Sequence, residues 1–191
     1  MEKQLAFLLE IDKLKNVVRK SPLIDQSRNE NSAEHSWHLA LYALILAGTA
    51  NTEVNVDRVI RMLLIHDIVE IDAGDHPIHE SKNNDLQKEL EQRAARRIFG
   101  LLPDGLLPNG QGAELMQLWQ EFEAGTSDDA AFAKSLDRFQ PLMHNIATGG
   151  GTWTEANVTK DQVIERYGPT IAGGSIELWT KAEQLVKEHF E

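Results

Sequence analysis

Apolar residues recur at helical spacing along most of this 191-residue chain. The segment QLAFLLEIDKLKNVV, at residues 4–18, places its leucines and isoleucine on one broad face, and DLQKELEQRAARRIFGLL, at residues 85–102, repeats the pattern. No segment shows the strong alternation of apolar and polar residues that is typical of a half-buried strand. The spacing therefore predicts an all-α protein.

Polar and glycine-rich stretches separate the expected helices. Ser32 is the expected N-cap of the second helix, and Asn55 or Asp57 the start of the third, which Gly74 ends. Pro141 is expected to bend or end a later helix. The expected helices after the first cover 33–50, 56–71, 85–102, 112–125, 128–147 and 174–190. Without an internal repeat or linker, the sequence predicts one domain over residues 1–191.

Composition narrows the classes of function. A net charge of −11 argues against a nucleic-acid polymer as partner, because phosphate backbones favour basic surfaces. The absence of cysteine excludes disulfides and cysteine nucleophiles, fits a cytoplasmic protein, and leaves His, Asp and Glu as metal ligands. No apolar run reaches the roughly 18 residues of a membrane span, and the charged N-terminal segment is unlike a signal peptide.

The stretch MLLIHDIVEIDAGD, at residues 62–75, carries ionisable groups in an apolar setting. A buried ion without partners costs several kcal/mol, and a divalent cation would offset that cost. His66 and Asp67, about 100° apart on a helix, can form two corners around one ion. Glu70 lies one turn beyond His66 and is better placed for proton transfer. The alternative is that His66 is a neutral core histidine.

Two other segments offer complementary ligands. His35 and His38 lie three residues apart on a largely apolar helix, so one of them can face a metal while the other packs. Asp137 lies in another mostly apolar helix, where the alternative is a salt bridge to Arg138 or Lys134.

The motifs AEHS at 33–36, HD followed by VE and GD at 66–75, and the later Asp in SLDRFQ resemble the HD-domain superfamily of metal-dependent phosphohydrolases. The resemblance covers nearly the whole chain. It implies an orthogonal helical bundle and one divalent metal ion, bound by His35, His66, Asp67 and Asp137. The chain is most similar to the bacterial branch that includes the deoxyribonucleoside 5′-monophosphatases. That similarity implies roles in the site for Glu70 as an acid–base group and for Asp75.

The resemblance also guides the expected substrate contacts. In that branch an arginine, an aromatic residue and a proline precede the first histidine, whereas this chain reads RKSP, with Ser21 in place of the aromatic residue. Arg19, Lys20 and Arg28 are the candidate phosphate-binding residues. Asp75 would accept a hydrogen bond from a sugar 3′-hydroxyl and crowd a 2′-hydroxyl. The base should matter little, because Ser21 offers no aromatic face.

These residues predict a phosphomonoesterase that hydrolyses deoxyribonucleoside 5′-monophosphates, in a homodimer that binds neither nucleic-acid polymers nor membranes. Mixed nitrogen and oxygen ligands favour Mn, Co, Fe, Ni or Zn over Mg. Two alternatives stay open. The protein could hydrolyse another phosphate ester, such as a cyclic nucleotide or a guanosine polyphosphate, or it could be a non-catalytic dimerisation or ligand-sensing module with a structural metal. The remaining histidines, His76, His79 and His189, are expected at the surface.

Overall fold

The computed structural model describes residues 1–76, 78, 84–103 and 110–191. His79 lies outside the described residues. Within them, most of the chain is helical, as the sequence predicts. In chain order the elements are α1 (Glu2–Ile11), the 3₁₀ helix η1 (Asp12–Asn16), β1 (Val18–Pro22), β2 (Asn29–Asn31), α2 (Ser32–Leu46), the 3₁₀ helix η2 (Ala47–Thr49), α3 (Val56–Ile65), α4 (Glu70–Ala73), α5 (Asn84–Phe99), α6 (Gln111–Ala124), α7 (Asp128–Ala147), α8 (Gly151–Glu155), α9 (Lys160–Gly174) and α10 (Ile176–His189).

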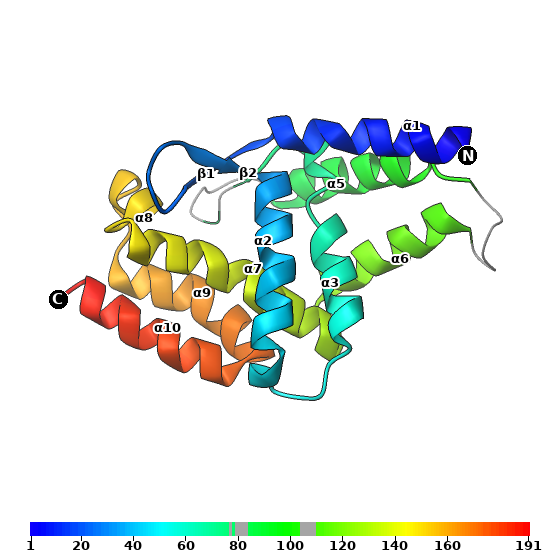
Figure 1. Cartoon of the computed structure of the whole chain (residues 1–191). Helices are drawn as coiled ribbons and strands as arrows, with labels where there is room; N and C mark the ends of the chain where they lie inside the picture. The colour runs from blue at the N-terminus through cyan, green and yellow to red at the C-terminus, as the bar shows by residue number, and fades with distance from the viewer. Residues whose placement is uncertain (77, 79–83, 104–109) are drawn as a thin grey trace.

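Helices α2 and α3 lie side by side near the centre of the molecule, and α1 and α5 cross their upper ends (Figure 1). Helix α7 packs against α3 and α9, and α10 packs against α9. The core between these helices consists of fully buried large side chains, among them Leu39, Met62, Leu63, Phe132, Leu136, Leu142 and Ile171. Four aromatic residues expected in the core or a dimer contact are also buried: Trp119, Phe122, Phe132 and Phe139.

A two-stranded antiparallel sheet is one departure from the all-helical expectation. The first segment was expected to stay helical to Val18, but η1 ends at Asn16 and the chain becomes extended. Val18 pairs with Asn31 and Pro22 with Asn29. Proline and the branched valines favour extended backbone over helix. The sheet places β1 beside the N-terminus of α2, to the left of the upper end of that helix in Figure 1.

The expected helix over 56–71 is interrupted. Helix α3 begins after Asn55, whose side chain accepts a hydrogen bond from the backbone N–H of Arg58, as predicted. It ends at Ile65. Backbone hydrogen bonds between residues three apart, such as Glu70 N to Asp67 O at 2.9 Å, then form turns before α4. Gly74, with a φ of 78°, ends α4. His66 and Asp67 therefore lie in turns between two helices rather than within one helix.

Two other features differ from expectation. Asn31, not Ser32, caps α2, in a capping box with Glu34. Helix α7 spans Asp128–Ala147, the expected range, with Pro141 inside it. Helix α9 was not predicted, because its glycines and Pro169 weaken the helical pattern. Its Gly168 has a packing reason, since an added Cβ would lie 2.8 Å from the Trp179 ring.

One face of α2 was expected to be buried but is exposed. Trp37 is 60% exposed and Ile45 is 80% exposed, and Leu41 and Leu44 continue the same stripe. In the first segment Leu5, Leu8 and Leu9 are exposed as well. Phe7 and Leu14 of the same segment are buried. Among the residues that the structure describes, no helix is both long and apolar enough to cross a membrane.

Candidate metal centre and active site

Three elements bring the four predicted metal ligands together. His35 lies in α2, His66 and Asp67 follow α3, and Asp137 lies in α7. One ligand atom from each of His35, His66 and Asp137 lies within 4.8 Å of the other two. Asp137 Oδ1 is 3.1 Å from His35 Nε2 and 3.5 Å from His66 Nε2. Asp67 is not part of this cluster of three, but its Oδ1 lies 3.1 Å from His66 Nε2 and its Oδ2 lies 4.0 Å from His35 Nε2.

The hydrogen bonds of both rings leave a lone pair facing these carboxylates. His66 Nδ1 lies 2.8 Å from the Leu63 carbonyl and so carries the proton, and its buried Nε2 has no hydrogen-bond partner. His35 Nδ1 lies 3.1 Å from Gln140 Oε1, which makes the same tautomer the favoured one. An imidazole lone pair 3.1 Å from a carboxylate oxygen is repulsive unless a positive charge lies between them. The chemistry of this donor set therefore fits a divalent cation.

The pKa of His66 agrees with that conclusion. Burial lowers it, but Asp67 and Asp137 raise it above its ordinary value. For Asp137 burial raises the pKa, and His35 and His66 together bring it well below its ordinary value. The site therefore favours positive charge among its nitrogens and negative charge on its oxygens.

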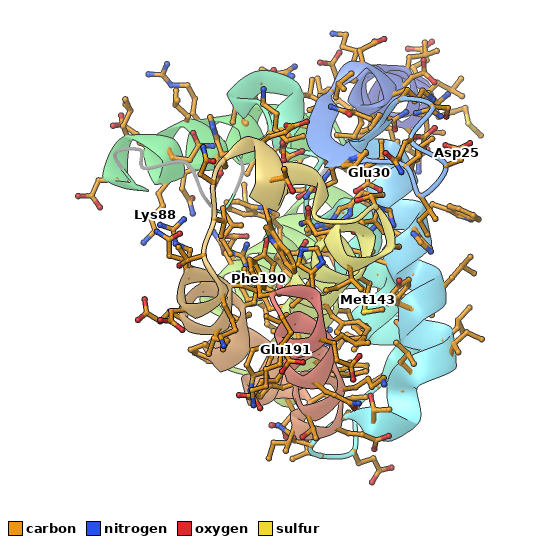
Figure 2. All side chains as sticks on the ribbon, turned by 90° about the vertical axis from the view of Figure 1, so that its left-hand side faces the viewer. Asp25, Glu30, Lys88, Met143, Phe190 and Glu191 are labelled. Atoms are coloured by element: carbon orange, nitrogen blue, oxygen red, sulfur yellow. The ribbon has the colours of Figure 1, made fainter. Side chains whose placement is uncertain are left out.

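A second layer of buried polar groups fixes His35. Gln140 Nε2 donates to Glu30 Oε2 at 3.1 Å, and Glu30 Oε1 is 3.4 Å from His35 Nδ1. Figure 2 shows Glu30 of β2 inside the molecule, whereas Asp25, in the connection between β1 and β2, lies at its edge. His144, which was expected to pack, is buried beside Gln140. Neither Glu30 nor Gln140 was predicted from the sequence, although Gln140 lies one turn after Asp137 on the same helix.

Arg19 links the metal ligands to the expected catalytic residues. Its guanidinium is largely buried and contacts three carboxylates, with Nη1 at 2.8 Å from Asp67 Oδ2, 3.3 Å from Asp75 Oδ1 and 3.7 Å from Glu70 Oε1. Burial lowers the pKa of Arg19, but these carboxylates raise it above its ordinary value. Arg19 therefore stays charged and holds the three acidic groups around it.

Glu70 and Asp75 are both mostly buried next to that guanidinium. Ser32 Oγ donates to Glu70 Oε2 at 2.6 Å, so the residue expected to cap α2 instead positions Glu70. Burial, together with the charge of Asp67, raises the pKa of Glu70 well above its ordinary value. Burial also raises the pKa of Asp75, and Arg19 opposes part of that rise. A carboxyl group with a raised pKa can exchange protons near neutral pH.

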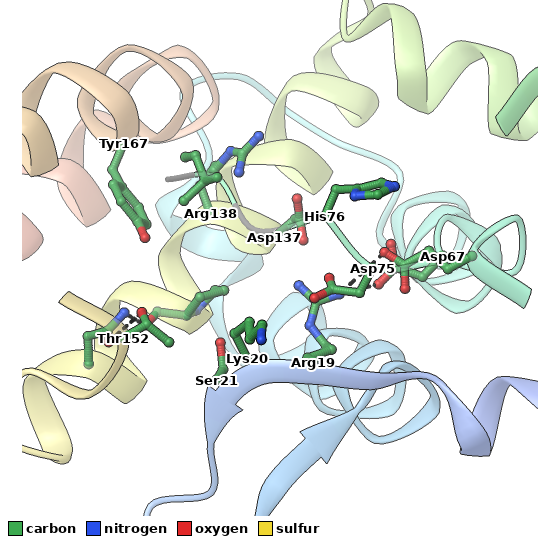
Figure 3. Close-up of a pocket in the computed structure, with 14 residues that line it drawn as sticks. Arg19, Lys20, Ser21, Asp67, Asp75, His76, Asp137, Arg138, Thr152 and Tyr167 are labelled. Carbon is green, nitrogen blue, oxygen red and sulfur yellow. Dashed lines mark hydrogen bonds and ion pairs between the residues drawn. The ribbon is translucent and has the colours of Figure 1, made fainter. Parts of the chain in front are cut away.

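These groups form one wall of a cavity of about 180 Å³ (Figure 3). Lys20 lines it, and so does His76, which was expected at the surface. The described residues that line it are Arg19, Lys20, Ser21, Asp67, Glu70, Asp75, His76, Ile78, Asp137, Arg138, Pro141, Asn145, Thr152 and Tyr167.

Arg28, a candidate phosphate ligand, does not line this cavity. Its guanidinium is exposed and donates to both carboxylate oxygens of Glu34, at 2.6 and 2.8 Å. Glu34 belongs to the capping box of α2, so this ion pair keeps Arg28 at the outer end of that helix. His189, expected at the surface, packs with its ring centroid 5.6 Å from that of Trp153.

Comparison with known proteins agrees with this geometry. The HD domain family matches residues 11–179, and the chain belongs to that family. A 5′-deoxynucleotidase HDDC2 from Mus musculus is 30% identical over 140 residues, which cover 73% of this chain and 66% of that protein. A 5′-deoxynucleotidase from Citrobacter koseri is 30% identical over 112 residues, which cover 54% of this chain and 56% of that protein. The chain thus spans slightly less than two thirds of the mouse relative.

A solved structure is similar along almost the whole chain. It comes from Magnetospirillum magnetotacticum, is described as a predicted metal-dependent phosphohydrolase, and is 50% identical with a TM-score of 0.91. The match covers 98% of this chain and 91% of that one. The expected resemblance and helical fold are therefore confirmed. The names of these relatives support a hydrolase, and the family implies a divalent metal ion, which the histidine and aspartate cluster fits.

Proposed function

We propose that the protein is a divalent-metal-dependent phosphomonoesterase that hydrolyses deoxyribonucleoside 5′-monophosphates to a deoxynucleoside and phosphate. The main support is one observation: two imidazole lone pairs and two carboxylates converge at a cavity that also contains the buried carboxyl group of Glu70. The names of the mouse and Citrobacter relatives support the substrate class.

His35, His66, Asp67 and Asp137 would hold the metal ion. Their mixed nitrogen and oxygen ligands suit Mn²⁺, Co²⁺, Fe²⁺, Ni²⁺ or Zn²⁺. A divalent ion in such a site polarises a phosphoryl oxygen and lowers the pKa of water. Gln140 keeps the His35 ring in the orientation that binding requires.

Glu70 is the proposed acid–base group. Its carboxyl group lies beside Asp67, and its raised pKa suits it to take a proton from the attacking water and deliver it to the leaving 5′ oxygen. Ser32 holds one oxygen of Glu70 at 2.6 Å, which fixes the direction of the other.

Asp75 is the proposed sugar-reading residue. It lies beyond the end of α4, in the same cavity and on the same guanidinium as Glu70. It would accept a hydrogen bond from the 3′-hydroxyl and leave no room for a 2′-hydroxyl. A ribonucleotide would then react slowly, because its displaced sugar moves the phosphorus away from the attacking water. Arg19 and Lys20, which line the same cavity, would bind the phosphate group of the substrate.

We also propose a homodimer and a cytoplasmic location. The exposed apolar stripe of α2, which contains Trp37 and Ile45, supports the first proposal. The absence of cysteine supports the second.

Phosphate release from all eight ribo- and deoxyribonucleoside 5′-monophosphates, measured with Mn²⁺, Co²⁺, Ni²⁺, Zn²⁺ and Mg²⁺, tests the proposed function. We expect turnover of deoxyribonucleotides above that of ribonucleotides. Asp75→Ala should lose activity on both and narrow the gap. Equal hydrolysis of AMP and dAMP would refute the sugar argument and favour another phosphate ester. Metal binding without any hydrolysis of phosphate esters would favour the non-catalytic module.

A further inference from the structure

Arg138 has no hydrogen-bond or ion-pair partner among the residues that the structure describes, although it lies at the site. It is half-buried, follows Asp137 on α7 and lines the same cavity (Figure 3). Within the described part of the chain its guanidinium forms no hydrogen bond or ion pair, since the neighbouring Asp137 faces His35 and His66 instead. A guanidinium has five N–H donors and no acceptor, so the donors of Arg138 are available to an acceptor that enters the cavity.

The other cations of the cavity differ in how far they are neutralised. Arg19 is surrounded by the carboxylates of Asp67, Asp75 and Glu70. Lys20 is exposed at the opposite wall and, like Arg138, has no carboxylate partner among the described residues. Lys20 comes from β1 and Arg138 from α7, so these two cations line the cavity from different elements (Figure 3).

The charges of the cavity show why these two cations matter. Among the described residues that line it, four carry carboxylates: Asp67, Glu70, Asp75 and Asp137. A divalent ion and Arg19 together offset at most three of those charges. Within this described lining, Lys20 and Arg138 are the unpaired cations that can supply positive charge to a phosphate dianion, and an uncompensated buried charge is costly.

We propose that Arg138 is a phosphate-binding residue, which donates from its guanidinium to the non-reacting oxygens of the substrate phosphate. The proposal rests on the proposed function for the identity of the phosphate ester. The planar fork of arginine matches two phosphate oxygens at once, which the point charge of lysine cannot do. Arg138 thereby supplies the cation that the sequence analysis assigned to Arg28.

The test is calorimetric binding of inorganic phosphate to the metal-loaded protein, with wild type compared with Arg138→Gln. We expect phosphate to bind about 10- to 100-fold more weakly, the usual range for a lost charge-assisted hydrogen bond. The KM for a deoxyribonucleotide should rise by a similar factor with kcat largely kept, as for a contact present in both ground and transition states. Metal content and melting temperature should stay at the wild-type values.

Arg93→Gln is the matched control. Arg93 is an exposed arginine of α5, outside the cavity and unpaired among the described residues, so its loss changes the net charge equally. It should leave phosphate affinity unchanged. Arg138→Lys keeps the charge but loses the fork, so it should bind phosphate more weakly than wild type, and it carries the test if Arg138→Gln does not fold.

Wild-type phosphate affinity in folded Arg138→Gln or Arg138→Lys would overturn the proposal, as would an equal loss in Arg93→Gln. A raised KM with unchanged phosphate affinity would also overturn it, because Arg138 would then contact the nucleoside. A wild type that hydrolyses no nucleotide, but whose phosphate affinity depends on Arg138, would refute the proposed function and retain this binding residue.

Discussion

Each histidine of the candidate metal centre uses one ring nitrogen for a structural hydrogen bond and directs the other toward Asp137. His66 donates to the carbonyl of Leu63, in the last turn of α3, and His35 donates to Gln140 of α7. The two rings are therefore oriented by different elements, and their Nε2 atoms meet at Asp137. Such outer hydrogen bonds set the tautomer and the direction of a metal-binding histidine.

Glu70 should be separable from the metal ligands. We expect Glu70→Gln to keep its metal and its melting temperature while kcat falls roughly 10²–10⁴-fold, because only proton transfer is lost. Asp72→Asn is the control: Asp72 is exposed and pairs with Arg97, so its loss should leave kcat near wild type. Loss of metal together with activity in Glu70→Gln would instead make Glu70 a metal ligand. Metal analysis and steady-state kinetics on the same samples distinguish the two results.

The candidate ligands could be proposed from the sequence, whereas the residues that support them could not. His66 and Asp67 stood out because they interrupt an apolar run, and the resemblance to the HD-domain family indicated His35 and Asp137. Glu30 and Gln140 act only because β2 and α7 meet beside His35, and a linear pattern does not reveal that meeting. The pairing of Arg28 with Glu34 was equally invisible until both were placed at the start of α2.

At the scale of elements, the geometry of the site depends on the first turns of α2. The two-stranded sheet places β1 beside this end of the helix, and β1 carries Arg19 and Lys20 to the cavity. The capping box of Asn31 and Glu34 satisfies two backbone N–H groups there. His35 lies within the first turns of the same helix, so fraying of α2 would displace it.

Asn31→Ala should therefore weaken both folding and metal binding. Loss of an N-cap costs about 1 kcal/mol, which lowers the melting temperature of a chain of this size by about 2–4 °C. Thr159→Ala removes the equivalent cap of α9, where Thr159 and Gln162 form the same motif. It should cost similar stability and leave metal affinity unchanged. Equal metal affinities of the two variants in competition with a chelator would contradict this account of α2.

The elements were predictable in kind more than in extent. Long segments with regular apolar spacing, such as α5 and α6, form helices as expected. Helix α9 escaped because Gly168 and Pro169 dilute its pattern, although the close approach of Trp179 requires that glycine. The turns after Ile65 were not predicted, because Ile68 and Val69 continue the apolar pattern of α3 and no glycine or proline marks its end.

At the scale of the molecule, the fold concentrates opposite charges in one cavity of a strongly acidic chain. The net charge is −11, yet Arg19 lines the cavity together with Lys20 and Arg138, which are unpaired among the described residues. The packed core of α2, α3 and α7 holds the candidate metal ligands in place, because His35 lies in α2, His66 follows α3 and Asp137 lies in α7. Exposure of one face of α2 was not predictable, since Trp37 and Ile45 are as apolar as the buried residues of the same helix.

The metal content of the purified protein is the most direct test of the central claim that His35, His66, Asp67 and Asp137 bind one divalent ion. Elemental analysis should find about one transition-metal ion per wild-type chain and almost none in folded His66→Ala and Asp137→Ala. His189→Ala, which removes an imidazole outside the cavity, should keep the wild-type content. Wild-type metal content in folded His66→Ala and Asp137→Ala would contradict the account.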